Sequence, residues 1–250
     1  MERRLALVIH SLAGGGAERV LAGLANHWVS LGNRVTVVTL ASAADDEFAL
    51  DARVERVALG LLQDSAHPLA AIRNTWRRVR ALRRVIRACE ADRVISFIDK
   101  MNVLVLMATR SLAVPVIVCE RTDPRRHQLG TVWSALRRWT YPRCSAAVVQ
   151  TSAVREFVQG LVRERPVYVI PNAVNSYNDK VQLHPPDSTQ RVCVALGRLS
   201  PEKGLDLFIE AAAQITDQHP NWRFEIYGEG CWRDQLDRHR LGLLDRRQWH

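Results

Sequence analysis

The sequence lacks several features that would each indicate a class of protein. It has no C-x-x-C pair, and its five cysteines are scattered at positions 89, 119, 144, 193 and 231. It also has no uninterrupted apolar run close to the roughly 18 residues of a membrane-spanning helix. We therefore expect neither a disulfide framework nor a zinc site, and reduced cysteines typical of a cytoplasmic protein.

A signal peptide is not indicated either. Basic residues precede an apolar run at the N-terminus, but the run from Leu5 to His10 is short. Residues 14–18, with three glycines, stand where a cleavage region would follow. We expect a first β-strand at this position.

Lysine is almost absent from a basic chain. Only Lys100, Lys180 and Lys203 are lysines among 35 cationic residues, and the net charge is +9. This charge favours anionic partners, but no recognised nucleic-acid-binding motif accompanies it, so we expect no DNA or RNA binding. With 250 residues, of which 47% are apolar, the chain has the composition of one large globular domain or two modest ones.

Strand-like and helix-like segments alternate as far as residue 170. The first strand leads into a helical pattern over 20–29, and residues 34–40 are rich in β-branched side chains. We expect further strands at 54–59, 93–98, 114–119, 146–150 and 167–170, and helices at 72–89, 103–111, 133–139 and 152–161. This order predicts a doubly wound, Rossmann-like α/β domain that binds ligands at the carboxyl ends of parallel strands.

The character of the chain changes near residue 175. Residues 175–190 are polar, contain two adjacent prolines and show no apolar period, so we interpret them as a linker. A second β-α-β pattern begins at Arg191. We expect an N-terminal domain over 1–174 and the start of a second Rossmann-like domain over 191–250, which is short of the ~100 residues of a complete doubly wound domain.

The most informative stretch is 192–204. An apolar run ends at Gly197, an amphipathic helix follows Gly204, and Arg198 and Lys203 lie in the loop between them. A helix N-terminus favours anions, so the two cations suit a phosphate or diphosphate, although solvated surface would look the same. The string G-R-L-x-P-E-K-G resembles the signature of the GT4 family of GT-B glycosyltransferases. That resemblance implies that Arg198 and Lys203 bind the diphosphate of the sugar donor.

Two glycine segments also resemble parts of GT4 enzymes. The G-G-A-E-R string at 15–19 follows the first strand, and is either a tight turn or a loop whose backbone approaches a phosphate. It resembles the N-terminal glycine loop of the family, which implies that Gly15 and Gly16 contact the donor. By the same resemblance, Gly228 in the Gly228-Glu229-Gly230 segment is a donor-binding residue.

Glu120 and Arg121 follow the strand predicted at 114–119. The segment resembles an E-R-x-x-P variant found in GT4 enzymes that build bacterial glycans, which implies a catalytic role for both residues. They would orient an acceptor hydroxyl and the leaving diphosphate, or they pair with each other. Residues 170–174 likewise resemble the I-P-N-G-V segment that ends the first domain of the family, with Ala173 replacing glycine.

The resemblance implies a function. A hexose would pass, with retained anomeric configuration, from a nucleotide sugar, UDP-linked, to a glycan or lipid-linked acceptor in bacterial surface-glycan synthesis. No metal ion or cofactor is implied, because Arg198 and Lys203 would neutralise the diphosphate and the sequence has no D-x-D. The E-x7-E segment of the family has no counterpart before His250, so we expect the chain as it stands to be an inactive fragment.

Two alternative functions are weighed against this one. A non-catalytic nucleotide- or phosphate-binding α/β module would carry the same loops, and transfer from a donor sugar would distinguish the two. A dehydrogenase is disfavoured because Leu40-Ala41-Ser42, rather than an acidic residue, ends the second predicted strand.

Residues 76–87 form a basic amphipathic pattern. Arginines occupy one face, and the other face holds Trp76, Val79, Leu82, Val85 and Ile86. We favour a surface helix packed on the sheet. The same pattern is typical of an interfacial helix, which would place the protein peripherally on an anionic membrane surface, at the inner face of the cytoplasmic membrane.

Overall fold

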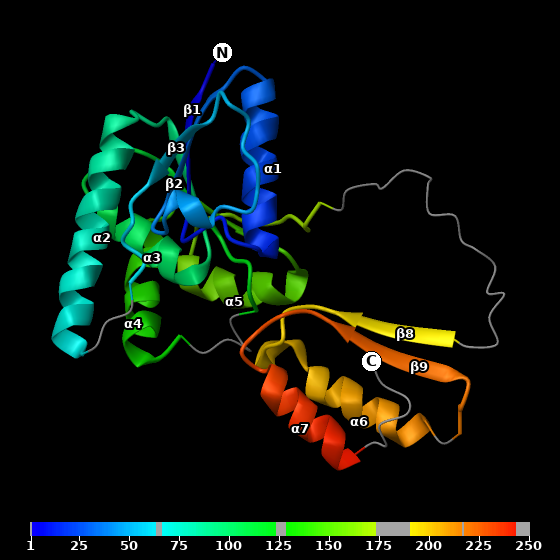
Figure 1. Cartoon of the computed structure of the whole chain (residues 1–250). Coiled ribbons are helices and arrows are strands. Elements are labelled where there is room, and N and C mark those ends of the chain that lie inside the picture. Colours follow the sequence, from blue (N-terminus) through cyan, green and yellow to red (C-terminus); the bar gives the residue numbers. More distant parts are fainter. Residues whose placement is uncertain (1, 64–66, 124–128, 174–190, 217, 244–250) are drawn as a thin grey trace. The chain divides into compact units, whose positions relative to one another are not determined.

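The computed structural model describes residues 2–63, 67–123, 129–173, 191–216 and 218–243 (Figure 1). The chain divides into two compact units, Met1–Asn175 and Ser176–His250. The predicted linker at 175–190 lies outside the described residues.

Seven parallel strands form the sheet of the first unit, in the order β3-β2-β1-β4-β5-β6-β7. The strands are β1 Arg4–Ile9, β2 Arg34–Thr39, β3 Glu55–Ala58, β4 Arg93–Phe97, β5 Val116–Cys119, β6 Ala146–Val149 and β7 Val167–Val169. The helices are α1 Gly16–Ser30, α2 Pro68–Ala88, α3 Asp99–Ala108, α4 Thr131–Thr140 and α5 Ser152–Val162. The predicted doubly wound α/β fold is therefore confirmed.

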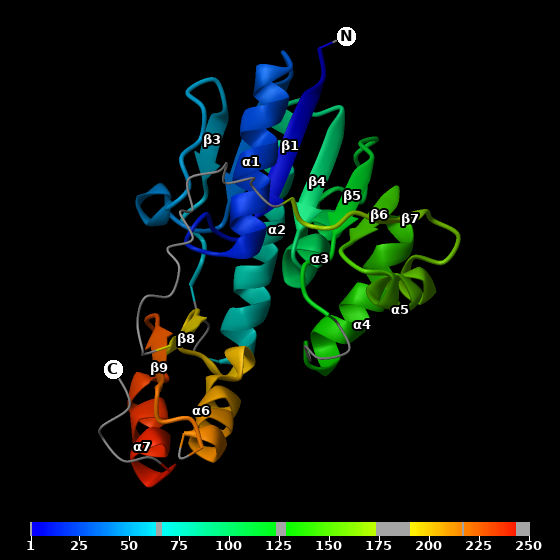
Figure 2. The same ribbon diagram turned by 90° about the vertical axis from the view of Figure 1, so that its right-hand side faces the viewer.

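A hydrophobic layer covers each face of this sheet. Because successive strand side chains alternate between faces, Leu7 packs with the α1 residue Leu21, whereas its neighbour Val8 belongs to the opposite layer. That second layer includes Leu82 of α2 and Leu104 of α3. Figures 1 and 2 show α1 on one side of the sheet and α2 and α3 on the other.

Two helices begin earlier than the sequence pattern predicts. α2 starts at Pro68 instead of residue 72, because proline suits the first turn of a helix. α3 starts at Asp99 instead of residue 103, directly after Ile98, whose φ of 75° interrupts the strand. The sequence pattern placed Trp76 and Val79 together on the apolar face of this helix. In the structure Trp76 is 54% exposed, whereas Val79 is buried.

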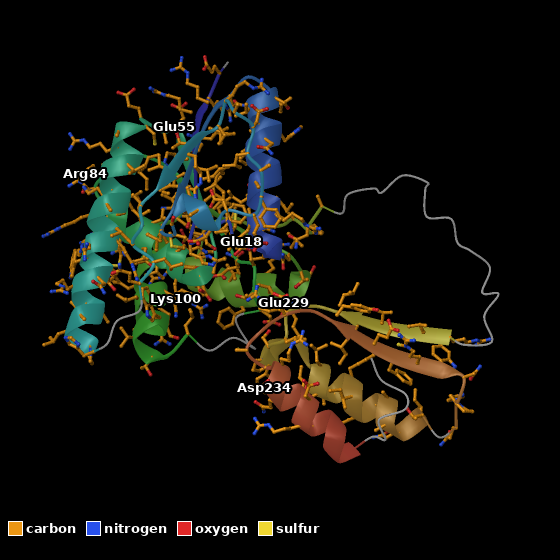
Figure 3. The ribbon with its side chains drawn as sticks, in the orientation of Figure 1. Glu18, Glu55, Arg84, Lys100, Glu229 and Asp234 are labelled. Atoms are coloured by element: carbon orange, nitrogen blue, oxygen red, sulfur yellow. The ribbon has the colours of Figure 1, made fainter. Side chains whose placement is uncertain are left out.

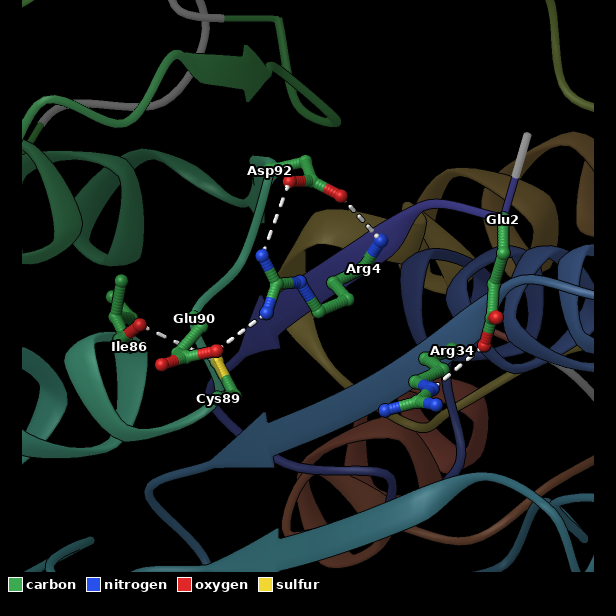
Figure 4. Close-up of polar contacts among 7 residues, drawn as sticks. All are labelled: Glu2, Arg4, Arg34, Ile86, Cys89, Glu90 and Asp92. Carbon is green, nitrogen blue, oxygen red and sulfur yellow. Dashed lines mark hydrogen bonds and ion pairs between the residues drawn. The ribbon is translucent and has the colours of Figure 1, made fainter.

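Ion pairs lie at the amino ends of the central strands (Figure 4). Arg4, the first residue of β1, pairs with Glu90 and Asp92 of the segment before β4. Arg34, the first residue of β2, pairs with Glu2 at 2.6 Å. The charges of Arg4 and Arg34 are therefore satisfied locally at this edge of the sheet.

The described part of the second unit, residues 191–216 and 218–243, contains a β-α-β element followed by a further α-helix. Strands β8 Arg191–Leu196 and β9 Trp222–Tyr227 are parallel neighbours, with α6 Leu205–Ile215 between them in sequence and α7 Arg233–Leu243 after them. Ile209 of α6, Phe224 of β9 and Leu236 of α7 share its core. The second β-α-β pattern predicted from the sequence is confirmed.

Candidate functional site

The carboxyl edge of the seven-stranded sheet gathers polar residues from separate segments. Pairing of Phe97 with Cys119, and of Cys119 with Val148, aligns the ends of β4, β5 and β6. The residues that follow these strands are consequently neighbours. The sequence motif at 120–121 lies in the middle of this edge, as expected for a ligand site in an open parallel sheet.

Arg121 is held firmly at this edge. Its guanidinium lies 4.7 Å from the ring centroid of Phe97, and its Nη1 donates to Oδ1 of Asn172 at 2.6 Å. Gln150 donates to the same Asn172 oxygen at 2.9 Å. Desolvation lowers the pKa of Arg121, partly offset by Cys119, but an arginine remains charged. The result is a positioned cation whose buried Nε has no hydrogen-bond partner.

Glu120 points to the opposite face of the sheet from Arg121. It is 1% exposed, and its Oε1 accepts a hydrogen bond from the hydroxyl of Tyr141, which is fully buried. Asn102 donates to the Tyr141 hydroxyl oxygen at 3.1 Å. The structure contains no ion pair between Glu120 and Arg121, because adjacent residues leaving a strand face opposite sides. The pairing alternative considered from the sequence therefore does not apply.

Burial controls the protonation of Glu120. Desolvation raises its pKa from 4.5 to about 7, and the hydrogen bond from Tyr141 acts in the opposite direction. Its second oxygen, Oε2, is buried without a hydrogen-bond partner. Near neutral pH this carboxyl group exists in both protonation states. It is suited to holding Tyr141 and the end of β5 in place.

Glu120 should make the protein less stable as pH rises from about 4.5 to 7. The folded state retains a proton that the unfolded state has released, so the free energy of unfolding falls across this range and levels off above pH 7. The expected difference is about 3 kcal/mol. Urea unfolding of the parent chain and of Glu120→Gln at several pH values measures it. In Glu120→Gln, the part of the fall in unfolding free energy that is due to Glu120 should be absent. The control Glu156→Gln, at an exposed position on α5, should retain it. Parallel pH profiles of the parent chain and Glu120→Gln would contradict the assignment.

Two carboxylates flank the glycine loop between β1 and α1. A Cβ atom built on Gly15 would lie 2.2 Å from Oε2 of Glu18, and one built on Gly14 would lie 2.4 Å from Oε2 of Glu47. Glu18 is buried, and its Oε1 is 3.5 Å from Nε2 of His10 (Glu18 is labelled in Figure 3). Negative charge so close to the loop opposes a phosphate there and favours neutral hydroxyl groups. Gly16 has open space where a Cβ would lie.

The motif at 192–204 and the glycines after β9 form one structure in the second unit. The backbone N–H of Gly197 donates to the Tyr227 carbonyl at 3.0 Å, and that of Leu199 donates to the Glu229 carbonyl at 2.9 Å. Gly228 lies so close to the other loop that a Cβ on it would be 1.8 Å from the carbonyl oxygen of Gly197. Two sequence motifs separated by about thirty residues are thus joined backbone to backbone.

Arg198 and Lys203 extend from this pair of loops. Both side chains are exposed, and the Cδ of Lys203 lies 3.8 Å from the position that a Cβ of Gly197 would occupy. Gly204, with φ of 63°, has the left-handed conformation that allows the turn into α6. The three predicted donor residues of this unit, Arg198, Lys203 and Gly228, therefore belong to one local structure. Their contact with a donor remains a prediction.

Family models match almost the whole chain. Residues 14–176 match the model described as Glycosyltransferase Family 4, and residues 177–249 match Glycosyl transferases group 1. The first match alone covers more than half of the chain. The chain belongs to Glycosyltransferase Family 4. Its fold class is GT-B, as the sequence motifs predicted.

Two relatives of assigned function match different lengths of this family member. One, 25% identical over 236 residues, is the GalNAc-alpha-(1->4)-GalNAc-alpha-(1->3)-diNAcBac-PP-undecaprenol alpha-1,4-N-acetyl-D-galactosaminyltransferase of Campylobacter jejuni. That match covers 94% of this chain and 64% of the relative. The phosphatidylinositol N-acetylglucosaminyltransferase GPI3 subunit of Saccharomyces cerevisiae is 35% identical over 86 residues, covering 30% of this chain and 19% of that protein. The chain thus spans less than two thirds of the length of either relative.

Solved structures with the same fold include two proteins in complex with UDP. Anabaena Alr3699/HepE in complex with UDP and glucose has a TM-score of 0.68 and 20% identity, covering 99% of this chain and 68% of that one. TarM of S. aureus, in complex with Fondaparinux, alpha-GlcNAc-glycerol and UDP, has a TM-score of 0.73 and 10% identity, covering 99% and 76%. At these identities the likeness establishes the fold.

Several residues of the carboxyl edge have no signal in the sequence. Phe97, Asn102, Tyr141 and Gln150 belong to strand or helix ends with ordinary composition, and only the folded sheet brings them to residues 120–121. Within the described ranges, no three or more His, Cys, Asp and Glu side chains are placed to share a metal ion.

Proposed function

We propose that this protein transfers a hexose from a nucleotide sugar, UDP-linked, to a glycan or lipid-linked acceptor, with retention of anomeric configuration. The observation that carries the proposal is the joined pair of loops in the second unit, which holds two exposed cations on a rigid backbone. Family membership and the UDP-bound structures of the same fold support this choice of donor.

The diphosphate is the leaving group of such a reaction. Arg198 and Lys203 would neutralise the charge that develops on it as the bond to the sugar breaks. The backbone contact of Gly228 with Gly197 fixes the loop that carries Arg198. Cationic side chains that are already fixed in position need not reorganise during the reaction. This preorganisation is the main source of electrostatic catalysis.

The carboxyl edge of the first unit would serve the sugar and the acceptor. Arg121 would orient a charged or hydroxyl group, because Phe97 and Asn172 hold its guanidinium in one direction. Glu120 would act through Tyr141 and the end of β5, since it is only 1% exposed. Gly15 and Gly16 would contact the transferred sugar, where the nearby carboxylates accept hydrogen bonds from hydroxyl groups.

Donor-dependent transfer is the direct test. The chain is incubated with individual UDP-hexoses and a lipid-diphosphate sugar acceptor, and NMR of any product gives its anomeric configuration. A product with the anomeric configuration of the donor supports the proposal. Transfer by the chain itself would also contradict the inactive fragment expected from the absent E-x7-E segment, whereas UDP binding without transfer in any donor and acceptor combination would agree with such a fragment or with a non-catalytic nucleotide-binding module.

We place the reaction on the cytoplasmic side of a membrane, with α2 as the contact. Its outward face carries exposed arginines at positions 73, 77, 80, 84 and 87 (Arg84 is labelled in Figure 3). Leu69, Ile72 and Trp76, at helical spacing, are also exposed, by 75%, 57% and 54%. Exposed apolar residues beside arginines are typical of a helix at an anionic bilayer surface. The described residues include no helix with the length and apolar character to cross a bilayer.

Removing two charges from α2 should weaken vesicle binding by about 30-fold. Each cation near an anionic surface contributes roughly 1 kcal/mol, an effect that salt screens. Co-sedimentation of Arg80→Gln/Arg84→Gln with phosphatidylserine-containing vesicles at low and high salt measures the loss. The control, Arg155→Gln/Arg163→Gln, makes the same charge change at exposed positions on and beside α5. Equal binding of the parent chain to neutral and anionic vesicles would exclude an electrostatic contact.

A further inference from the structure

Arg137 is a buried cation on α4. It is only 6% exposed, and its guanidinium lies 5.3 Å from the ring centroid of Phe157 in α5. Its Nε and Nη1 atoms are buried and form no hydrogen bond within the described part of the chain. An arginine does not lose its charge in a protein, and a buried charge without a polar partner is costly. The fold is therefore expected to supply negative charge or ordered water close to this guanidinium.

Glu120 supplies negative charge on the face of α4 that carries Arg137. Tyr141 ends α4 with helical φ and ψ, so its side chain and that of Arg137, four residues earlier, lie on one face. The Tyr141 hydroxyl donates to Glu120. Burial raises the pKa of both Glu120 and Tyr141, and the charge of Arg137 lowers both. Asp99 of α3 acts on the Glu120 carboxyl in the opposite direction to Arg137 and raises its pKa.

Two buried acceptors beside Tyr141 complement the two donors of Arg137. Oε2 of Glu120 and Oδ1 of Asn102 are buried, and neither has a hydrogen-bond partner among the described residues. Both residues are joined to the Tyr141 hydroxyl through their other polar atoms, Asn102 at 3.1 Å. Buried donors and acceptors that do not contact one another directly are commonly bridged by ordered water, which typically makes about three hydrogen bonds.

Glu120 is linked to Arg121 through the end of β5. The backbone N–H of Glu120 donates to the Val148 carbonyl at 2.9 Å, so this residue is still paired with β6. Arg121 lies on the other face of the sheet, where its guanidinium is 4.7 Å from the ring centroid of Phe97. Rotation of the peptide between the two residues would move both side chains. A fixed Glu120 carboxyl therefore also fixes the direction in which Arg121 leaves the strand.

We propose that Arg137 is a positioning residue for Arg121, and that it acts through an ordered water and the carboxyl group of Glu120. Arg137, Tyr141 and Asn102 hold this carboxyl group from the side of α3 and α4, and the carboxyl group holds the end of β5. The inference deepens the proposed glycosyl transfer, and it rests on that proposal for the role of Arg121 in the reaction.

NMR of the arginine Nε–H groups in the full chain tests the inference without any sugar transfer. The Arg137 signal is assigned by its through-space contacts with the Phe157 ring, and the Arg121 signal by its contacts with the Phe97 ring. Burial raises the pKa of Glu120 to about 7. Both signals should therefore shift with pH and share one midpoint close to that value. Glu120→Gln should abolish both shifts.

Replacing Arg137 separates its effect from that of burial. In Arg137→Met, loss of the cation should move the midpoint of the Arg121 signal upward by about one pH unit. Arg137→Lys keeps the charge and should leave the midpoint close to that of the parent chain. The control, Arg138→Met, makes the same change at the exposed neighbouring position of α4 and should titrate as the parent chain does.

Two results would overturn the inference. One is an Arg137 signal in the parent chain that does not shift together with the Arg121 signal. The other is an Arg121 signal in folded Arg137→Met with the parent midpoint. If that variant does not fold, the two signals of the parent chain decide.

The transfer reaction gives a second readout. Arg137→Met should lower kcat by about tenfold or more and leave the KM of the donor unchanged, because positioning affects the reacting geometry and the donor diphosphate is assigned to Arg198 and Lys203. An unchanged kcat would contradict the role of Arg137. A common titration of the two arginine signals without any sugar transfer would contradict the proposed function only. Sugar transfer with independent arginine signals would contradict this inference only.

Discussion

Replacing both Arg198 and Lys203 by alanine is expected to weaken the binding of UDP by about 10²- to 10⁴-fold. Each change removes a charge-assisted contact worth roughly 1.5–3 kcal/mol, and every 1.4 kcal/mol is a tenfold change in affinity. Both side chains are exposed, so the melting temperature should change little. Calorimetric titration of the parent chain, each single variant and the double variant with UDP measures the effect.

The salt dependence and a charge-matched control make this experiment specific. The control, Arg155→Ala/Arg163→Ala, removes two exposed arginines from the first unit and should bind UDP as the parent chain does. Addition of salt should weaken UDP binding to the parent chain more than to the double variant, because ions screen the charges. Unchanged affinity in the double variant would remove the basis for the donor site at this loop.

The fold was predictable because buried parallel strands read as short apolar runs between amphipathic helices. Val35–Val38 and Val116–Val118 have that pattern, and both are strands. Element ends were less predictable, since they depend on local chemistry. Pro68 starts α2 because the first turn of a helix needs no backbone N–H. α3 starts at Asp99, directly after Ile98, whose backbone is held by hydrogen bonds with Cys119 of β5 and with Asn102.

The site was predictable where one local structure carries it, and less so where it is assembled from distant segments. Arg198 and Lys203 lie within six residues of each other, so their common loop follows from the sequence. The opposite directions of Glu120 and Arg121 could also have been deduced, because side chains alternate along a strand. The burial of Glu120 beneath Tyr141 depends on the packing of α3 and α4, which the sequence pattern does not specify.

Gly228 is the glycine of the second unit at which an added Cβ would make the shortest contact. A Cβ there would lie 1.8 Å from the carbonyl oxygen and 2.9 Å from the carbonyl carbon of Gly197. These neighbours are backbone atoms, so no side-chain rotation can relieve the overlap. The hydrogen bonds on either side, from Gly197 to Tyr227 and from Leu199 to Glu229, hold the two loops at this separation. Alanine at 228 must therefore force them apart.

Gly228→Ala is expected to destabilise the second unit by about 3 kcal/mol or more, at the upper end of the cost of overpacking. It should also reduce UDP affinity as strongly as the double charge variant, because the loop that carries Arg198 is displaced. Hydrogen exchange of the β8 and β9 amides measures the first effect, and calorimetry with UDP the second. The matched control is Gly23→Ala in α1, where a Cβ meets nothing within 4 Å and alanine should stabilise the helix by roughly 1 kcal/mol. Parent-like exchange and UDP affinity in Gly228→Ala would mean that the close contact between the loops is not needed for the fold of this unit or for the donor site.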